Sequence, residues 1–294
     1  QSYLATAPDD ADAHNLAGIA KRDLGDAPAA RTHLAQAVAL APQETSYIVN
    51  LANVLVDLGE GPAALAAVEA PLRTSPGQPD ALLARVHILQ RLGRSDEALA
   101  TARMAVAFNR ELPRARYVLG LALFKAGERE PALENFQAAA TLAPDYAEAW
   151  LNAGVVQKDL GRYRDAEASY RHALALSPRD PFIRNNLANL LSTLGRQDEA
   201  LAEFRAALEL DPAYIEAKIN LAVAQRDHGQ SDGAVTTLAE ALVQHPDHAG
   251  LLNAYGNTLR QAGDLDQALV MLHRAIAVDP THAEAQNNLG LAYA

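Results

Sequence analysis

Glycine recurs at one fixed interval along nearly the whole chain, and this recurrence limits the fold more than any other feature. Eight glycines stand 34 residues apart, at Gly25, Gly59, Gly93, Gly127, Gly161, Gly195, Gly229 and Gly263. A period of this length is typical of stacked supersecondary units, in which each unit buries its apolar face against its neighbours. The chain is therefore predicted to be an array of repeated units.

Alanine and proline keep the same period, and each register has a physical reason. An alanine follows each glycine five positions later, with a second alanine (once Pro71) seven positions further on; a proline closes every unit except the one at Arg110. Glycine ends a first helix because it adopts left-handed backbone angles without a Cβ penalty. The two alanines share one face of a second helix, where small side chains let another helix approach. Proline then ends the second helix, so each unit is predicted to be a helix pair.

Residues 147–180 carry the pattern most completely. They show Trp150, Gly154, Gly161, Tyr163, Ala166, Tyr170, Ala173 and Pro178. With these residues and its period, the whole chain resembles the tetratricopeptide repeat (TPR) family. The resemblance implies an all-α fold, a right-handed α-solenoid superhelix of helix-turn-helix pairs.

The period divides residues 11–282 into eight repeats. They start at residues 11, 45, 79, 113, 147, 181, 215 and 249, and positions within each are numbered 1 to 34 below. Residues 1–10 are interpreted as the tail of a preceding repeat, and residues 283–294 as the first helix of a ninth. Because a solenoid needs polar caps over its end faces, we expect a segment of a longer protein, with end-to-end self-association as the alternative.

Residues 60–112 depart from the pattern. Pro71 falls inside a predicted second helix, where it removes a hydrogen bond at a cost of about 3 kcal/mol if the helix stays straight. Val86 occupies a small-residue position, and Arg110 replaces the closing proline. We expect the helix with Pro71 to be kinked or shortened, and this stretch to pack less regularly.

Composition excludes several classes of function. The net charge of −11 repels phosphate backbones, so nucleic acid is not an expected ligand. The chain has no cysteine, which excludes disulfides and thiolate metal sites. No apolar run approaches the roughly 20 residues that span a bilayer, and no signal peptide is visible. We expect a cytoplasmic protein without membrane insertion; a signal peptide that had been removed would leave no trace here.

The sequence shows no pattern of catalytic or cofactor chemistry. Serine, histidine and aspartate form no known triad spacing, and the nine histidines occupy different repeat positions. His245 and His248 are separated by Pro246 and lack a cluster of carboxylates to complete a metal site. We expect no enzyme activity, metal or cofactor in these residues.

Asparagine gathers on a few positions of the predicted first helices. The family resemblance implies that positions 2, 5, 6, 9, 12 and 13 face the inner, concave surface. Of 14 asparagines, 12 lie at positions 5, 6 or 9, Asn15 among them. We predict that peptide is bound by Asn50, Asn53, Asn152, Asn185, Asn186, Asn189, Asn220, Asn253, Asn257, Asn287 and Asn288.

An amide side chain donates and accepts together, which matches one peptide unit of an extended backbone. Asparagine is a mediocre helix former, so propensity does not explain its presence inside helices. The column resembles the asparagine ladder in the TPR region of O-linked N-acetylglucosamine transferases, which holds extended substrate polypeptide. Asn152, Asn186 and Asn220 match it best because they are consecutive. The alternative interpretation is that these amides bridge helices or cap local backbone.

The sequence therefore predicts a module that binds a partner protein or an extended peptide. Two alternatives stay open: the substrate-recognition arm of a larger glycosyltransferase, and a self-associating assembly scaffold. A carboxylate clamp of the chaperone-binding type is disfavoured, because position 5 holds no lysine in any repeat. The bias of arginine over lysine is typical of a GC-rich genome and favours a bacterial source.

Overall fold

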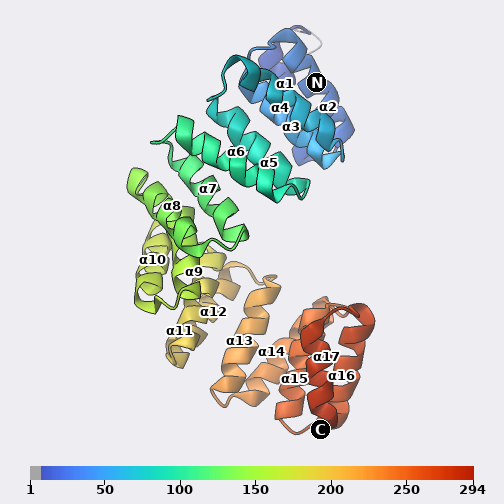
Figure 1. Ribbon diagram of the computed structural model, residues 1–294. Coiled ribbons are helices and arrows are strands. Elements are labelled where there is room, and N and C mark those ends of the chain that lie inside the picture. The colour runs from blue at the N-terminus through green and yellow to red at the C-terminus, as the bar shows by residue number, and fades with distance from the viewer. Residues whose placement is uncertain (1–7) are drawn as a thin grey trace. The chain divides into compact units, whose positions relative to one another are not determined.

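The computed structural model describes residues 8–294, and their regular structure is entirely helical (Figure 1). These residues form 17 helices and no strand, which confirms the prediction of an all-α fold. Residues 1–7, most of the predicted N-terminal tail, lie outside the described residues.

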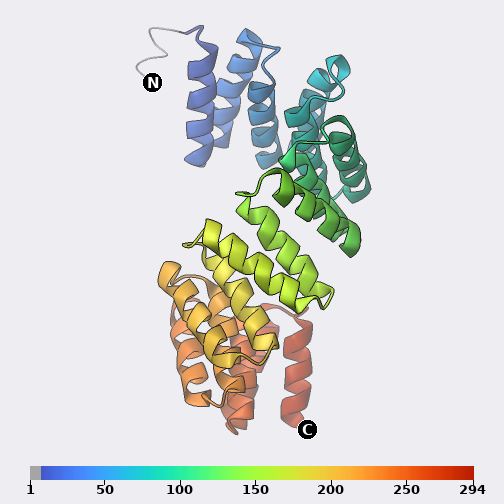
Figure 2. The ribbon, with the colours of Figure 1, turned by 90° about the vertical axis from the view of Figure 1, so that its left-hand side faces the viewer.

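The helices alternate between two kinds, a first and a second helix in each repeat. The first helices are α1 (Ala11–Asp23), α3 (Thr45–Asp57), α5 (Pro79–Arg91), α7 (Pro113–Lys125), α9 (Ala147–Asp159), α11 (Pro181–Thr193), α13 (Ile215–Asp227), α15 (Ala249–Gln261) and α17 (Ala283–Tyr293). The second helices are α2 (Ala27–Leu40), α4 (Gly61–Thr74), α6 (Ser95–Phe108), α8 (Arg129–Leu142), α10 (Tyr163–Leu176), α12 (Gln197–Leu210), α14 (Ser231–Gln244) and α16 (Leu265–Val278). The two helices of a pair lie side by side, as α1 and α2 do, and α15 and α16 (Figures 1 and 2).

The eight periodic glycines end the first helices in the left-handed conformation. Their φ angles run from 72° at Gly93 and Gly161 to 90° at Gly263. The residue after each glycine then donates its N–H to a carbonyl five residues back, as from Asp26 to Lys21 at 2.9 Å. This bond satisfies a carbonyl that the helix end would leave unpaired, and it fixes where the second helix begins.

Small residues hold the two helices of a pair close together. The alanines at positions 20 and 27 of the second helices are fully or almost fully buried, as at Ala166 and Ala173. On the first helix, a Cβ added at Gly120 would lie 2.7 Å from the Phe136 ring of the second helix. A Cβ at Gly256 would lie 2.7 Å from Leu272. The core therefore runs between paired helices and repeats from one unit to the next.

The departures from the pattern leave helix lengths unchanged. The helix with Pro71, expected to be kinked or shortened, is not shortened: α4 has 14 residues, like the other second helices, and Ser75 N still donates to Pro71 O at 2.9 Å. Proline removes its own N–H, so the carbonyl four residues earlier loses its partner while the rest of the ladder persists. Near Arg110, Asn109 closes α6 by donating its side-chain amide to Ala105 O at 3.2 Å and to Gly77 O at 3.0 Å.

The helices form two compact parts, an N-terminal part that ends at Val156 and a C-terminal part that starts at Gln157. In the N-terminal part each first helix also contacts the next first helix, along α1, α3, α5 and α7. The C-terminal part repeats this arrangement along α11, α13, α15 and α17. Within each part, no two second helices of the described residues are in comparable contact. Each part therefore has an inner surface made of first helices.

Within the described residues, none of the helices combines the length and the apolarity that would let it cross a bilayer.

The left-handed glycines provide a direct test of the turn. At Gly127 an added Cβ would meet only Arg129 Nη1, at 3.9 Å, so Gly127→Ala acts through the backbone. We expect it to lower the free energy of unfolding by about 1–2 kcal/mol, measured by urea denaturation followed by circular dichroism. Gly290→Ala is the control, because Gly290 is helical and its Cβ would meet no described atom within 4 Å. The control should be neutral or slightly stabilising; equal losses in both variants would contradict this account.

Candidate functional site

A hollow of about 500 Å³ lies on the first-helix surface of the N-terminal part. Its lining comes from α1, α3, α5 and α7, at repeat positions 2, 5, 6, 9 and 12. The lining residues are Arg22, Ser46, Val49, Asn50, Asn53, Asp80, Leu83, Ala84, His87 and Arg114. All of these positions are among those that the family resemblance implies for the inner surface.

A second hollow, of about 360 Å³, adjoins the first. The two share Leu83, His87 and Arg114, so they form one continuous depression across successive repeats. The second hollow is more apolar and aromatic, and includes Tyr117 and Tyr146. The rings of these tyrosines are 4.9 Å apart, centroid to centroid. Burial raises the pKa of both phenols, that of Tyr146 to about 12, so both remain neutral hydrogen-bonding groups at physiological pH.

The asparagines at positions 5 and 6 pair between successive first helices. We call this line of contacts, from position 6 of one repeat to position 5 of the preceding repeat, the seam. Asn220 Nδ2 of α13 donates to Asn185 Oδ1 of α11 at 3.1 Å. Asn50 donates to Asn15 in the same way at 2.9 Å. In each case the donor at position 6 follows the acceptor by 35 residues, and the bond joins one repeat to the next.

Two further bonds follow the same offset. Asn288 Nδ2 donates to Asn253 Oδ1 at 2.9 Å. Where position 5 holds Tyr117, Asn152 Nδ2 donates to its hydroxyl at 3.2 Å. The seam thus accepts either an amide or a phenol as the partner of the position-6 asparagine.

Two of the position-5 asparagines in these pairs are buried. Asn185 is 6% exposed and Asn253 is 7% exposed. Asn185 Nδ2 also donates to the Tyr214 hydroxyl at 3.3 Å, and Asn253 Nδ2 to Glu284 at 3.5 Å. Burial of an amide is costly unless its donors and acceptors are satisfied, and these partners satisfy them.

The other predicted site residues differ in their surroundings. Asn186 Nδ2 donates to the backbone carbonyl of Phe182 at 2.8 Å, and Asn152 likewise to that of Glu148 at 2.9 Å. Asn189 is half-buried on α11. Asn257 Oδ1 accepts a bond from Arg260 at 2.9 Å. Asn287 is exposed.

A hollow of about 490 Å³ in the C-terminal part collects several of these amides. It is lined by Asn257, Ala283, Glu284, Asn287 and Asn288. In the N-terminal part Asn50 and Asn53 line the larger hollow. The two roles overlap, because Asn50 and Asn288 each line a hollow and also make a seam bond.

Position-6 asparagines that bond through Nδ2 keep an available acceptor, and the three that bond another asparagine show this. Asn50, Asn220 and Asn288 are half-buried, and each uses Nδ2 for its seam bond. Their Oδ1 atoms have no donor among residues 8–294. The seam bond fixes the rotation of each amide, so these oxygens are held in place before any ligand arrives.

Sequence reasoning missed the apolar and charged residues that line most of the depression. Leu83 and Tyr117 lie at position 5, His87 at position 9 and Arg114 at position 2. Their repeat positions could have predicted them, because these residues share positions with the predicted asparagines or adjoin them on the same helix face.

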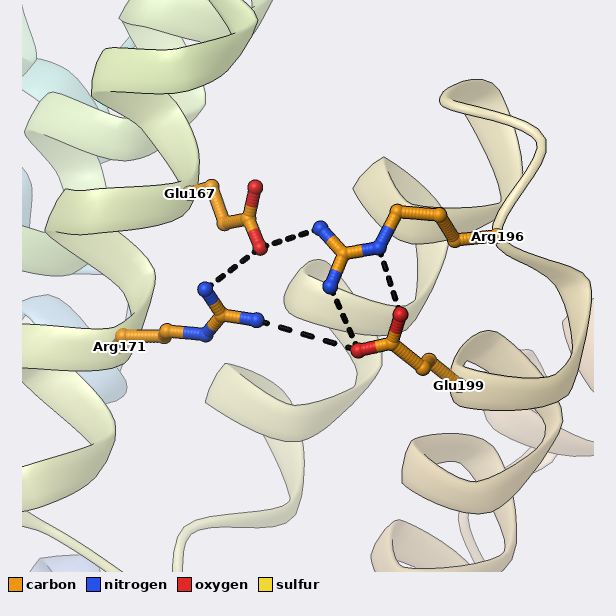
Figure 3. Close-up of polar contacts among 4 residues, drawn as sticks. All are labelled: Glu167, Arg171, Arg196 and Glu199. Atoms are coloured by element: carbon orange, nitrogen blue, oxygen red, sulfur yellow. Dashed lines mark hydrogen bonds and ion pairs between the residues drawn. The ribbon is translucent and has the colours of Figure 1, made fainter.

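A set of ion pairs on the second helices has a structural role (Figure 3). Arg196, at the start of α12, donates to Glu167 of α10 at 2.6 Å and to Glu199 at 2.6 Å. Arg171 binds the same oxygen of Glu167 at 2.7 Å. Hydrogen bonds to Glu199 and Glu167 raise the pKa of Arg196, and its bond lowers the pKa of Glu199. These charges neutralise one another and link successive repeats.

Comparison with known proteins identifies the repeats. Tetratricopeptide repeat models match residues 49–116, 156–215 and 193–255, and a TPR repeat model matches residues 120–161 and 256–294. Together these matches cover most of the chain. Among curated proteins no sequence matches this chain significantly.

Solved structures show the same fold. TTC0263, a thermophilic TPR protein of Thermus thermophilus, is 33% identical over 61% of this chain and 97% of its own, with a TM-score of 0.50. A chain of the APC/C hetero-tetramer Cut9-Hcn1 is 18% identical, with a TM-score of 0.69 over 90% of this chain. The present chain spans about half of that chain, 52%. A tetratricopeptide repeat protein from Parabacteroides merdae is 17% identical, with a TM-score of 0.57, over 97% of this chain and 99% of its own.

The seam can be tested by comparing two asparagines on α11. Asn185→Ala removes the acceptor of Asn220 and the donor to Tyr214, and both of these half-buried residues lose a partner. We expect a loss of about 1–3 kcal/mol in the free energy of unfolding, measured by urea denaturation. Asn189→Ala is the matched control, because Asn189 makes no side-chain bond to another helix in the described part of the chain; its change should stay within about 0.5 kcal/mol. A neutral Asn185→Ala variant would show that the seam bonds do not stabilise the fold.

Proposed function

Because the chain belongs to the tetratricopeptide repeat family, we propose that it is a protein-binding scaffold whose first-helix surface holds an extended segment of a partner. Tetratricopeptide repeats are interaction modules without catalytic machinery of their own. The proposal goes further than the family, since it names the surface and the conformation of the ligand.

The observation that supports it most strongly is the depression in the N-terminal part. It runs over α1, α3, α5 and α7, and successive repeats supply equivalent positions to its lining. Val49, Leu83 and Ala84 provide apolar surface, while Asn50 and Asn53 provide amides. Specific ligand sites typically combine apolar walls with a few placed polar groups, and an extended peptide presents both side chains and main-chain groups to such a surface.

The fixed amides supply a way to hold a main chain. Each of Asn50, Asn220 and Asn288 could accept one peptide N–H at Oδ1 while its Nδ2 stays in the seam. We infer that the position-5 asparagines, such as Asn185, act indirectly by fixing these acceptors. In this proposal the position-6 asparagines accept hydrogen bonds from the ligand, and the position-5 asparagines hold them in place.

The expected affinity is modest. A hydrogen bond of this kind contributes about 1 kcal/mol net, and ordering a flexible peptide offsets much of the sum. Peptide segments should therefore bind with dissociation constants of about 1 μM or weaker. The two alternatives, a substrate arm of a larger transferase and a self-associating scaffold, stay predictions from the sequence.

Blocking the depression tests the proposed function. Asn53→Trp places a large ring among the residues that line the hollow, and we expect peptides to bind at least about tenfold more weakly to it. The ligands are peptides selected on the wild-type protein from a phage-displayed library of random dodecapeptides. Their binding is measured by fluorescence polarisation.

Gln137→Trp is the matched control. Gln137 is exposed on α8, a second helix, so the same bulk is added away from the first-helix surface. The control should bind as the wild type does. If the library yields no binding peptide, or if the two tryptophan variants behave alike, the proposed function is rejected.

A further inference from the structure

The depression in the N-terminal part is rich in cations, although the chain as a whole is acidic. The net charge of the protein is −11. Yet the larger hollow is lined by two arginines, Arg22 and Arg114, against a single carboxylate, Asp80. A cleft whose local sign opposes that of the whole molecule concentrates field lines and attracts ligands of the opposite charge.

Ion pairs beside the hollow engage one of its two arginines. Arg22 Nε donates to Asp57 Oδ2 at 2.7 Å, and Arg91 Nη1 lies 3.5 Å from the other oxygen of the same carboxylate. Asp57 is thus shared by two guanidinium groups. The linings of the two hollows hold two arginines and one aspartate, and Glu148 outside them acts on Tyr117 and Tyr146. Arg114 is therefore the arginine of the lining that is left for a ligand.

Arg114 is placed to meet a ligand. It is exposed, and it lines both the larger and the smaller hollow. Its guanidinium has no hydrogen bond or ion pair with the described residues. A guanidinium offers a planar pair of donors that matches a carboxylate, so this side chain can bind one without breaking an internal contact.

His87 lies close to the same arginines. It lines both hollows, and its pKa is lowered, first by burial and then by the charges of Arg91 and Arg22. Asp57 opposes this shift only in part. His87 is therefore uncharged at neutral pH, and the cationic character of the depression comes from the arginines.

The hollow of the C-terminal part has the opposite character. Its lining consists of three asparagines, Ala283 and Glu284, without a cation. The excess of positive charge is therefore a property of the N-terminal depression and does not follow from the repeat itself.

We propose that the segment held in the N-terminal depression is acidic, an extended peptide whose aspartate or glutamate side chain binds Arg114. This inference rests on the proposed function and adds the chemistry of the ligand. Tyr117 and Tyr146 lie in the same smaller hollow as Arg114, so an apolar ligand residue next to the acidic one meets an aromatic wall. The preferred ligand thus carries a carboxylate beside an apolar side chain.

The composition of selected peptides tests this proposal. Random dodecapeptides displayed on phage are panned against the full chain and against Arg114→Glu and Arg205→Glu. Arg205 is exposed on α12, a second helix, so its substitution changes the net charge equally but far from the depression in the sequence and on another helix type. Selected peptides are then measured by fluorescence polarisation, each beside a version with glutamine or asparagine in place of its acids.

We expect selection on the wild type to enrich aspartate and glutamate. Arg114→Glu should bind the selected peptides about threefold to tenfold more weakly, and Arg205→Glu should bind them as the wild type does. The amide versions should lose a similar factor. Selected peptides without an acidic excess, or equal losses in the two charge-reversal variants, would overturn the proposal while the scaffold function stood. A library that yields no peptide would reject both.

Discussion

The close approach of the two helices within each repeat decides which side chains are left to meet a ligand. At Gly120 and Gly256 the space that a Cβ would need is occupied by Phe136 and Leu272 of the paired second helix. That contact commits one face of the first helix to the core. The opposite face, at positions 2, 5, 6, 9 and 12, is what remains for the inner surface, and the two adjoining hollows that form the depression lie there.

Asparagine adds a second constraint, between repeats. An amide at position 6 donates to position 5 of the preceding repeat, as from Asn220 to Asn185, so neighbouring first helices are held at a fixed offset. The Oδ1 atom of the same side chain has no donor within the described residues and remains available to a ligand. One residue type can therefore serve stability and binding together, and losses of binding in asparagine variants have to be judged against losses of stability.

The local chemistry of a few residue types explains which parts of the structure could be predicted from the sequence. Glycine at the helix ends, alanine at the buried positions and proline at the unit ends act through neighbouring residues, so helix pairs could be predicted from their period. The asparagine bonds depend on the distance and rotation between first helices in different repeats, which local preferences do not set. Asn185 and Asn186 thus give the same sequence signal, yet one bonds across the seam and the other bonds its own helix. At Pro71 the helix is not shortened, because one lost hydrogen bond does not end a helix whose other contacts persist.

A bound peptide should contact the first-helix surface, and site-specific photocrosslinking detects such a contact. A benzophenone amino acid at Leu121, which lines the smaller hollow on α7, should form a covalent adduct with a selected peptide on irradiation. The same group at Gln137, on the second helix α8, should form none. Adducts at Gln137 with none at Leu121 would contradict the account, because the ligand would then lie on the outer helices.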